Sequence, residues 1–247
     1  MICKSPQDFA GIRAAARMTA EVLRLAADAV EPGATTLDLN DYIHACIIGR
    51  GATPLFLNYR KYPKSSCVSI NHEVIHGIPS AKRVIQPGDI VSIDIGVLLN
   101  RYCGDCATTV AVGKISPEKQ RLLDATRRAL DAGIAAAHAK NRVGDISHAV
   151  QAVVESAGCS VVEDFVGHSI GFKLHEDPQI PNFGRPERGT ILRPGHVLCI
   201  EPMVNFGAKE VETLSDQWTI ATRDGLPSAH FEHMVLVTES GPEILTL

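Results

Sequence analysis

Two eight-residue segments of this sequence resemble each other, and each ends in a carboxylate. The first runs Pro-Gly-Asp-Ile-Val-Ser-Ile-Asp from Pro87 to Asp94, and the second runs Pro-Gly-His-Val-Leu-Cys-Ile-Glu from Pro194 to Glu201. In both, a Pro-Gly turn opens an apolar strand that ends in an acid. Because an isolated ionised carboxylate is costly to bury, such acids are normally paired or bound to a cation. The pattern predicts a metal centre shared between two halves of the chain.

A second acid lies on the arm of a predicted hairpin that follows Asp94. If the chain turns back around Leu99 and Asn100, Asp94 lies directly opposite Asp105, and such side chains are about 5 Å apart at Cβ. Two like charges at that distance repel unless a cation lies between them. The alternative is an acidic pair that faces solvent, but the residues on both sides of Asp94 are too apolar for an exposed strand. The metal interpretation is therefore favoured.

Two further residues complete the candidate ligand set. Glu232 lies in an apolar segment near the C-terminus and is predicted to pair with Glu201 as Asp105 pairs with Asp94. Its alternative is an edge-strand glutamate facing solvent, which the symmetry between the halves disfavours. His168 lies at an apolar strand end flanked by glycines, where the backbone can approach a ligand closely. The candidate metal ligands are Asp94, Asp105, His168, Glu201 and Glu232.

Four carboxylates and one imidazole suit one or two divalent metal ions. Carboxylate-rich sets favour Mn, Fe(II), Co or Mg over the thiolate sets of structural zinc. A bound ion of this kind lowers the pKa of water to about 7 and so supplies a hydrolytic nucleophile. Since the ligands must be deprotonated, metal affinity is expected to fall in acid.

The other histidines fall into three groups. His76 and His175 share a His-x-x-Pro pattern, which makes them candidate counterparts in the two halves. Neutral imidazoles beside a metal can donate or accept a proton during catalysis. A lone histidine near a strand end is more often a core residue, so this prediction depends on the pair. Surface or capping positions are predicted for His44, His138, His148 and His196, whereas His72 and His230 are unassigned.

Composition excludes several classes of protein. The 247 residues are 45% apolar and 21% charged, as in an ordinary soluble protein, and can bury a sizeable core. A net charge of −4 gives no electrostatic footprint for nucleic acid. No apolar run is long enough to span a membrane, and the N-terminus lacks the pattern of a signal peptide. Seven irregularly spaced cysteines favour reduced thiols and a cytoplasmic location.

Cys103 and Cys106 form a Cys-x-x-Cys pattern that could indicate a redox site or half of a zinc site. No second cysteine pair or nearby histidine completes a zinc tetrad, and no helix follows at once. We therefore interpret both residues as buried thiols that flank Asp105.

The elements that must position these residues repeat along the chain. A helix is predicted from the Ser5-Pro6 cap to about Val30, followed by strands and turns between residues 58 and 112. Three further helices are predicted: Thr36 caps one that runs to 49–51, Ser116-Pro117 caps one that runs to about Lys140, and Asp145 caps one that ends near Gly158.

The repeated elements keep a nearly constant spacing. Two of the predicted helix starts align 109 residues apart, and the Pro-Gly turns lie 107 residues apart. This near-constant offset favours an internal duplication. We predict one catalytic domain of two pseudo-twofold-related α+β halves, about 1–112 and 113–247, with the site between them.

The order Asp, Asp, His, Glu, Glu resembles the dinuclear metallopeptidases of the pita-bread fold, and above all type I methionine aminopeptidases. The segment Val68–Pro79 is similar to that family's pocket segment, and Ile200–Asn205, Trp218–Ile220 and Phe231–His233 are similar to its C-terminal signatures. The resemblance covers nearly the whole chain. It implies an α+β pita-bread fold in which the helices of two halves pack on a curved antiparallel sheet.

The same resemblance implies a function and roles for residues. The four acids and the histidine above would hold two divalent ions (Co, Mn, Fe(II), Zn or Mg), and His76 and His175 would contact the substrate. Glu201 is our candidate proton shuttle. The substrates would be nascent polypeptide N-termini with a small second residue, with the ribosome as a further partner and neither membrane nor nucleic acid bound. The implied methionine pocket is lined by Tyr59, Tyr62, Cys67 and Trp218.

The sequence differs from the family pattern around His168. The usual phrase Gly-His-Gly-Ile-Gly-Arg-x-Phe-His-Glu is replaced by Gly-His-Ser-Ile-Gly-Phe-Lys-Leu-His-Glu. Leu174 stands where an aromatic residue usually lines the pocket, and Phe56 stands where a smaller residue, often Cys, is usual. The ligand set is unchanged, so the expected effect is on substrate preference and catalytic efficiency. The four differences in this segment are Ser169, Phe172, Lys173 and Leu174.

Three alternative functions follow from the same residues. A proline-directed peptidase of the same fold usually carries a preceding domain, for which this chain has no room. A catalytically inactive scaffold or binding protein would be expected to lose a ligand, and none is lost. A redox protein using Cys103 and Cys106 would act without a divalent metal.

Overall fold

A computed structural model describes residues 2–247 and contains four α-helices in that range. They are α1 (Pro6–Asp28), α2 (Thr36–Gly49), α3 (Pro117–Ala136) and α4 (Val143–Ser156), with a short 3₁₀ turn, η1 (Tyr59–Lys61). The predicted helices are confirmed, although the third ends four residues before Lys140.

Two helix caps differ from the prediction. Thr35, not Thr36, caps α2 and receives a hydrogen bond from the backbone of Asp38. Asp145 lies one turn inside α4 and accepts from the backbone N–H of Arg142.

The strands are short except for one long hairpin. They are β1 (Thr53–Pro54), β2 (Ser66–Ile70), β3 (Glu73–Ile75), β4 (Ile90–Leu99), β5 (Tyr102–Ala111), β6 (Ser160–Val161), β7 (Gly167–Ser169), β8 (Glu176–Ile180), β9 (Val197–Ile200), β10 (Met203–Asn205), β11 (Val211–Thr213), β12 (Ile220–Thr222), β13 (Ser228–His230), β14 (His233–Thr238) and β15 (Gly241–Ile244).

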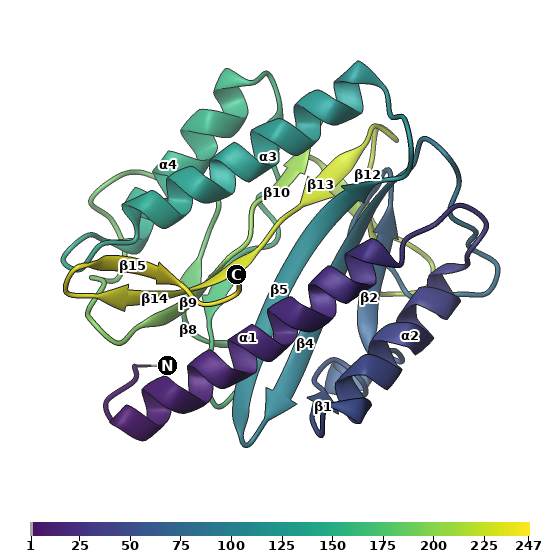
Figure 1. The fold of residues 1–247 in the computed structure, drawn as a ribbon. Helices are drawn as coiled ribbons and strands as arrows, with labels where there is room; N and C mark the ends of the chain where they lie inside the picture. Colours follow the sequence, from purple (N-terminus) through teal and green to yellow (C-terminus); the bar gives the residue numbers. More distant parts are fainter. Residues whose placement is uncertain (1) are drawn as a thin grey trace.

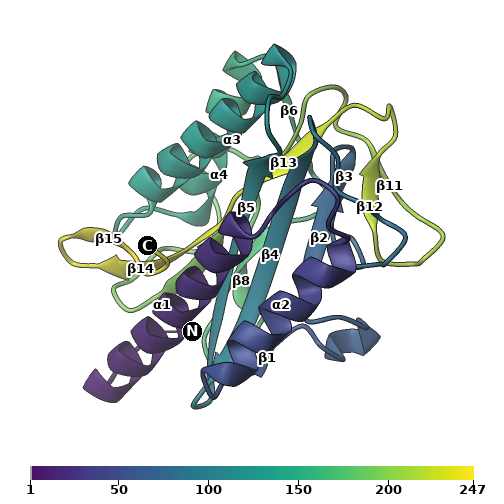
Figure 2. The same cartoon turned by 45° about the vertical axis from the view of Figure 1, so that its right-hand side comes forward.

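These strands form four antiparallel sheets. In the first half β5, β4, β2 and β1 pair together, and in the second half the order is β15-β14-β9-β7-β8. Of the two smaller sheets, β13-β10-β6 lies within the second half, and β11-β12-β3 joins the halves through β3. Figure 2 shows β11 and β12 beside β3 at one side of the molecule. The α+β class is confirmed.

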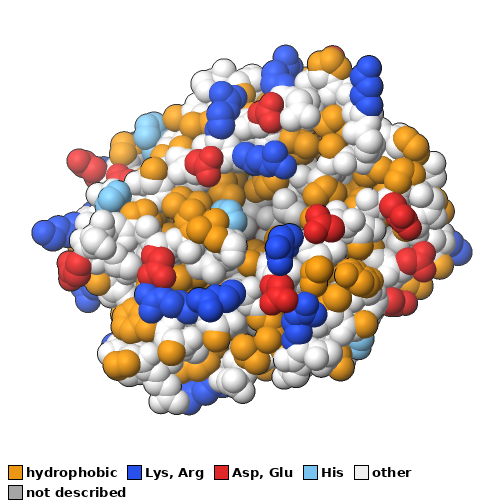
Figure 3. Space-filling view, viewed as in Figure 1, with side chains coloured by type: hydrophobic (Ala, Val, Ile, Leu, Met, Phe, Trp, Pro, Cys, Tyr) orange, Lys and Arg blue, Asp and Glu red, His pale blue; other side chains and the backbone are white. Residues whose placement is uncertain are grey.

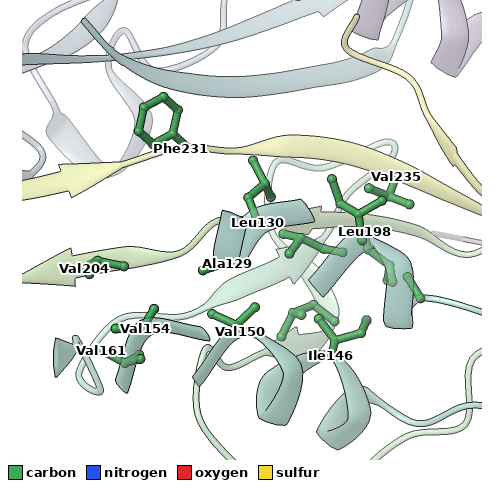
Figure 4. Close-up of a cluster of buried hydrophobic side chains, with 14 of the residues drawn as sticks. Ala129, Leu130, Ile146, Val150, Val154, Val161, Leu198, Val204, Phe231 and Val235 are labelled. Carbon is green, nitrogen blue, oxygen red and sulfur yellow. The ribbon is translucent and has the colours of Figure 1, made fainter. Parts of the chain in front are cut away.

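Each half places its two helices against its own strands. Figure 1 shows α1 and α2 along the hairpin of β4 and β5, and α3 and α4 over the strands of the second half. The core under α3 and α4 includes Leu130, Ile146, Val150 and Leu198, which point toward one another in Figure 4. The two helix pairs therefore bury one face of the sheets and leave the other for the site.

The helical face shows no single-sign charge patch. On the side of α1 and α3, Lys and Arg are interspersed with Asp and Glu and with apolar side chains (Figure 3). In residues 2–247 no helix combines the length and the apolar composition that crossing a membrane requires.

The internal repeat is more regular than the sequence alignment suggested. The helices α2 and α4 begin at Thr36 and Val143, 107 residues apart. This spacing equals that of the two Pro-Gly turns and replaces the predicted offset of 109. The division of the chain into halves at about residue 113 stays a prediction.

Candidate metal centre and substrate pocket

Asp94 is oriented by the alternation of side chains along β4. Its neighbours Ile93 and Ile95 are fully buried and pack in the core with residues of α1 and α2. Because successive side chains in a strand point to opposite faces, Asp94 points away from the helices. The same face of β5 carries Asp105, which is 4% exposed.

The predicted register of this hairpin was wrong by two residues. Asp94 pairs with Ala107, and Asp105 pairs with Gly96. The turn is formed by Asn100 and Arg101, which have φ of 46° and 71°. Two successive residues with positive φ form the tight turn that suits a twisted hairpin. Since the error is an even number of residues, both acids still lie on the same face, as diagonal rather than direct neighbours.

The second half supplies the other three candidate ligands. His168 is in β7 and pairs with Cys199 of β9, one residue before the end of that strand. Glu201 follows β9 and Glu232 precedes β14, just beyond the last paired residues of the two strands. The two glutamates lie opposite each other where this register is continued by one residue, but the ladder does not extend to them. Instead, the backbone N–H of Glu232 donates to Ala107 O at 2.9 Å and ties the second half to β5.

The imidazole of His168 is held in one orientation. Its Nδ1 lies 3.0 Å from the carbonyl oxygen of Ser169, so Nδ1 carries the proton and donates. Its Nε2 therefore carries the lone pair, 3.7 Å from Asp105 Oδ2 and 3.5 Å from Glu201 Oε1. A backbone acceptor on the distal nitrogen is the usual support of a metal-bound histidine.

The acids of the centre hold their protons more strongly than exposed acids. Burial raises the pKa of Asp94 to about 6, although His230 and a hydrogen bond with Asp105 oppose the shift. Burial, followed by mutual repulsion, raises the pKa values of Asp105, Glu201 and Glu232 well above their usual range. Burial also lowers the pKa of His168 to about 3, which leaves this ring neutral.

Several polar atoms at the centre lack a hydrogen-bond partner among the described residues. They are Asp94 Oδ1, Asp105 Oδ1, Glu232 Oε1 and His230 Nε2. Buried oxygens of this kind cost free energy unless something pairs with them. A divalent cation would accept these lone pairs and relieve the repulsion between the carboxylates. The donor set therefore fits a metal, as the sequence predicted.

The tightest group of ligand atoms includes a residue that the sequence did not indicate. Single atoms of Asp105, His168, Cys199 and Glu232 lie within 4.8 Å of one another. Burial raises the pKa of Cys199 well above its usual value, and three neighbouring acids raise it further. Cys199 therefore lies in the wall of the centre, close to three of the predicted ligands.

His230 is the other residue missed by sequence reasoning. It is 2% exposed, and its Nε2 lies 3.6 Å from Glu201 Oε2. Its position two residues before Glu232 is a signal that could have found it, because alternate residues of an extended segment share a face. His196 takes the capping role of the two that were predicted: its Nδ1 accepts from Arg193 N, and the residue is buried.

A cavity of about 330 Å³ joins the five candidate ligands to the predicted substrate residues. All eleven residues that the sequence predicted for the site line this cavity. Two residues that differ from the family pattern at the pocket also line it. In addition to the five candidate ligands, it is lined by His76, His175, Tyr59, Tyr62, Cys67, Trp218, Phe56 and Leu174.

His76 is held by an unusual backbone. It has φ of 59°, which is uncommon for a residue with a side chain. Its ring lies edge-on to Phe165 and Trp218, with centroids at 5.9 and 6.1 Å. Burial, with smaller contributions from His230 and His175, lowers the pKa of His76 to about 4. The ring is neutral at pH 7 and can donate or accept a proton.

His175 reaches the cavity from the other half. Its ring centroid is 4.4 Å from that of His168, and its Nδ1 lies 2.7 Å from Tyr59 Oη. Burial lowers the pKa of His175, and the guanidinium of Arg60 lowers it further. His76 and His175 therefore face the same cavity from different halves, as predicted.

Aromatic and sulfur-bearing side chains form the closed end of the cavity. The rings of Tyr62 and Trp218 meet edge to face at 5.1 Å, and Tyr62 Oη donates to the carbonyl oxygens of Ser66 and Gly77. Burial raises the pKa of Cys67 well above its usual value, so its thiol is neutral. An unbranched thioether side chain fits such a wall.

The two pocket residues that differ from the family pattern are both buried. Phe56 and Leu174 are 8% and 4% exposed and belong to the same apolar cluster. Phe56 fits because of Gly96: a Cβ there would lie 2.4 Å from the Phe56 ring. The added aromatic ring therefore depends on a glycine beside Asp94.

The Cys-x-x-Cys pair is structural. Cys103 and Cys106 lie in β5, are buried and form no disulfide. Burial raises the pKa of Cys103 to about 11 and that of Cys106 well above its usual value. Neutral thiols of this kind are poor nucleophiles, which disfavours the redox alternative.

Comparisons with known proteins agree over the whole chain. The sequence profile of metallopeptidase family M24 matches residues 10–239. A methionine aminopeptidase of Clostridium acetobutylicum is 47% identical over 247 residues, which cover 100% of this chain and 99% of the relative. Methionine aminopeptidase 1 of Bacillus subtilis is 46% identical, with coverage of 100% and 99%.

Solved structures give the same result for the fold. The crystal structure of methionine aminopeptidase from Rickettsia prowazekii matches with a TM-score of 0.97 at 41% identity, covering 100% of both chains. A prolidase of Pyrococcus furiosus shares the fold with a TM-score of 0.79, but at 22% identity, and this chain covers 65% of it. The predicted pita-bread fold is confirmed.

Proposed function

The chain belongs to metallopeptidase family M24, and we propose that it is a metal-dependent aminopeptidase that removes methionine from the N-terminus of polypeptides with a small second residue. The observation that carries the proposal is a cluster of four carboxylates and one oriented imidazole beside a pocket of aromatic and sulfur-bearing side chains. Its substrates would be nascent chains in the cytoplasm, with the ribosome as a further partner.

We assign the metal to Asp94, Asp105, His168, Glu201 and Glu232. Four carboxylates carry more charge than one divalent ion neutralises, which supports a pair of ions (Co, Mn, Fe(II), Zn or Mg). Bound there, such ions would activate a water molecule and polarise the scissile carbonyl.

The remaining roles belong to residues of the chain. The side chains of Tyr59, Tyr62, Cys67 and Trp218 would bind the methionine and set its orientation. His76 and His175, both neutral at pH 7, would contact the peptide bond and donate or accept protons there. Glu201 would pass a proton to the leaving amine, as a carboxylate beside the reacting bond can. The two histidines leave little room beside the scissile bond, which supports a small second residue.

The test is hydrolysis of four peptides in parallel, with Co or Mn supplied. Methionine should be released from Met-Ala-Ser, but not from Met-Ile-Ser, and leucine should be released poorly from Leu-Ala-Ser. Faster cleavage of an Ala-Pro peptide would establish the proline-directed alternative instead. No cleavage of any peptide by a protein with full metal content would favour the inactive scaffold.

A further inference from the structure

A second hollow opens from the site at His175. Its volume is about 640 Å³, and it shares Arg60, Val166, His168, His175 and Gln179 with the substrate cavity. None of the four methionine-pocket residues lines it. The hollow therefore continues from the proposed reaction centre on the side away from the methionine. We call it the downstream groove.

One wall of the downstream groove is the edge of a sheet. The strand β8 is the last strand of the order β15-β14-β9-β7-β8, and it supplies Asp177 and Gln179 to the groove, both exposed. Pro178 lies between them, as is usual for prolines confined to edge strands. An extended polypeptide can align with the edge of a sheet. The geometry therefore suits a chain segment rather than a compact small molecule.

The groove is also lined by an exposed aromatic ring that its neighbours hold in place. Phe172 is 41% exposed, and the guanidinium of Arg101 lies 4.4 Å from its ring centroid. The ring of Tyr102 lies 5.3 Å away on a tilted plane. These contacts orient Phe172 without burying it, and leave apolar surface beside the exit from the reaction centre.

The charge at the groove favours an acidic occupant. Arg60 and Lys173 line it, and Arg101 is stacked on Phe172 at its margin. Two acids, Glu176 and Asp177, also line the groove. Glu176 Oε1, however, accepts the backbone N–H groups of Phe172 and Lys173, so this carboxylate faces the loop backbone. Three cations at the groove and its margin therefore stand against two carboxylates, of which Asp177 is exposed and Glu176 is half-buried.

We propose that the downstream groove binds the third and fourth residues of the substrate polypeptide in an extended conformation, and that Arg60 and Lys173 favour acidic side chains there. The proposal rests on the proposed aminopeptidase function. At about 3.3 Å per extended residue, residues three and four would extend about 7 Å beyond the second residue. Substrates with the same first two residues would thus differ in kcat/KM according to their third and fourth residues.

The test compares Met-Ala-Glu-Glu-Ser-Trp with Met-Ala-Lys-Lys-Ser-Trp. At low salt, kcat/KM should be about 3- to 10-fold higher for the glutamate peptide, the scale of one or two partly exposed ion pairs, and the ratio should shrink as salt screens them. In the double variant Arg60→Gln/Lys173→Gln the ratio should fall to about 1. Lys114→Gln, at an exposed lysine between β5 and α3, should keep the wild-type ratio.

The tripeptide Met-Ala-Ser separates the two proposals. It ends before the fourth residue and carries no charged side chain, so it reports methionine release alone. If the wild type releases methionine from it but cleaves both hexapeptides equally, or if the double variant keeps the preference, the groove proposal is overturned. If the metal-loaded wild type releases no methionine from the tripeptide, the proposed function fails instead.

Discussion

Asp94 contributes to the electrostatics of every other acid at the candidate centre. Its charge raises the pKa values of Asp105, Glu201 and Glu232, and one of its own oxygens has no hydrogen-bond partner among the described residues. Asp94 also lies on the first-half hairpin, whereas both glutamates come from the second half. A cation held by Asp94 and by either glutamate would therefore join the halves.

We expect Asp94→Asn to lower metal content and to reduce methionine release by more than about 100-fold, because even loss of a supporting group around a metal costs about 10- to 100-fold. The amide keeps the shape of the carboxylate but removes its charge, so the protein should stay folded. Metal analysis and peptide hydrolysis measure both effects. Asp28→Asn, at an exposed position near the end of α1, is the matched control. Wild-type metal stoichiometry in Asp94→Asn would remove Asp94 from the ligand set.

At the residue scale the sequence predicted the acids well and their surroundings poorly. Acids stand out in apolar strands because the cost of burying a charge is large. His230 and Cys199 do not stand out, because histidine and cysteine are common in cores. Their positions depend on which strands meet at the centre, and that information is long-range. The ligand roles themselves stay predictions.

At the scale of elements, the segment that carries His76 is fixed at several points. Gly77 N donates to Ser69 Oγ, and a Cβ on Gly77 would lie 2.3 Å from the carbonyl oxygen of Val68. Arg83 pairs with Glu73 and donates to Ile78 O, so it contacts the chain on both sides of His76. These contacts hold the positive φ of His76, which costs free energy and persists only where the surroundings enforce it.

Arg83→Met should therefore lower kcat by about 10-fold or more while KM changes little, since small misplacements of a catalytic group can cost up to about 100-fold. Arg50→Met is the matched control, because it breaks the Arg50–Glu21 ion pair on another part of the structure. Steady-state kinetics and melting temperatures should be measured for both variants. Equal kcat in Arg83→Met and Arg50→Met, at similar melting temperatures, would show that Arg83 does not position His76.

Helices were easier to predict than strand register. Ser5 and Ser116 are followed by proline and then by helical sequence, so local signals determine where α1 and α3 begin. The register of β4 against β5 depends on the turn residues Asn100 and Arg101. Neither is glycine, so the positive φ of both residues was not evident. Strands of two or three residues, such as β6, have no period long enough to recognise.

For the whole molecule, the two halves concentrate negative charge at their junction, and this makes stability depend on pH. In the metal-free protein, Asp105, Glu201 and Glu232 have folded-state pKa values well above those of the unfolded chain. The folded state then binds more protons, so this stabilisation is present in acid and is lost as pH rises through the folded pKa values. His168 acts oppositely: its lowered pKa costs stability only below about pH 6.5, the value of an unfolded histidine.

The carboxylates decide the slope in the window that begins at about pH 6.5, where an unfolded histidine has lost its proton, and ends where the pH passes their raised folded-state pKa values. We expect the melting temperature of the metal-free protein to fall as pH rises through this window. With Mn in excess the slope should reverse, because a metal binds the deprotonated ligands and stabilises the folded state more strongly as protons leave. Calorimetry at three pH values, with and without metal, measures both slopes.

Glu232→Gln removes one of the three acids and should flatten the metal-free slope, whereas Asp28→Asn should leave it unchanged. A metal-free melting temperature that rises with pH would mean that these acids are not held protonated together at the junction of the halves.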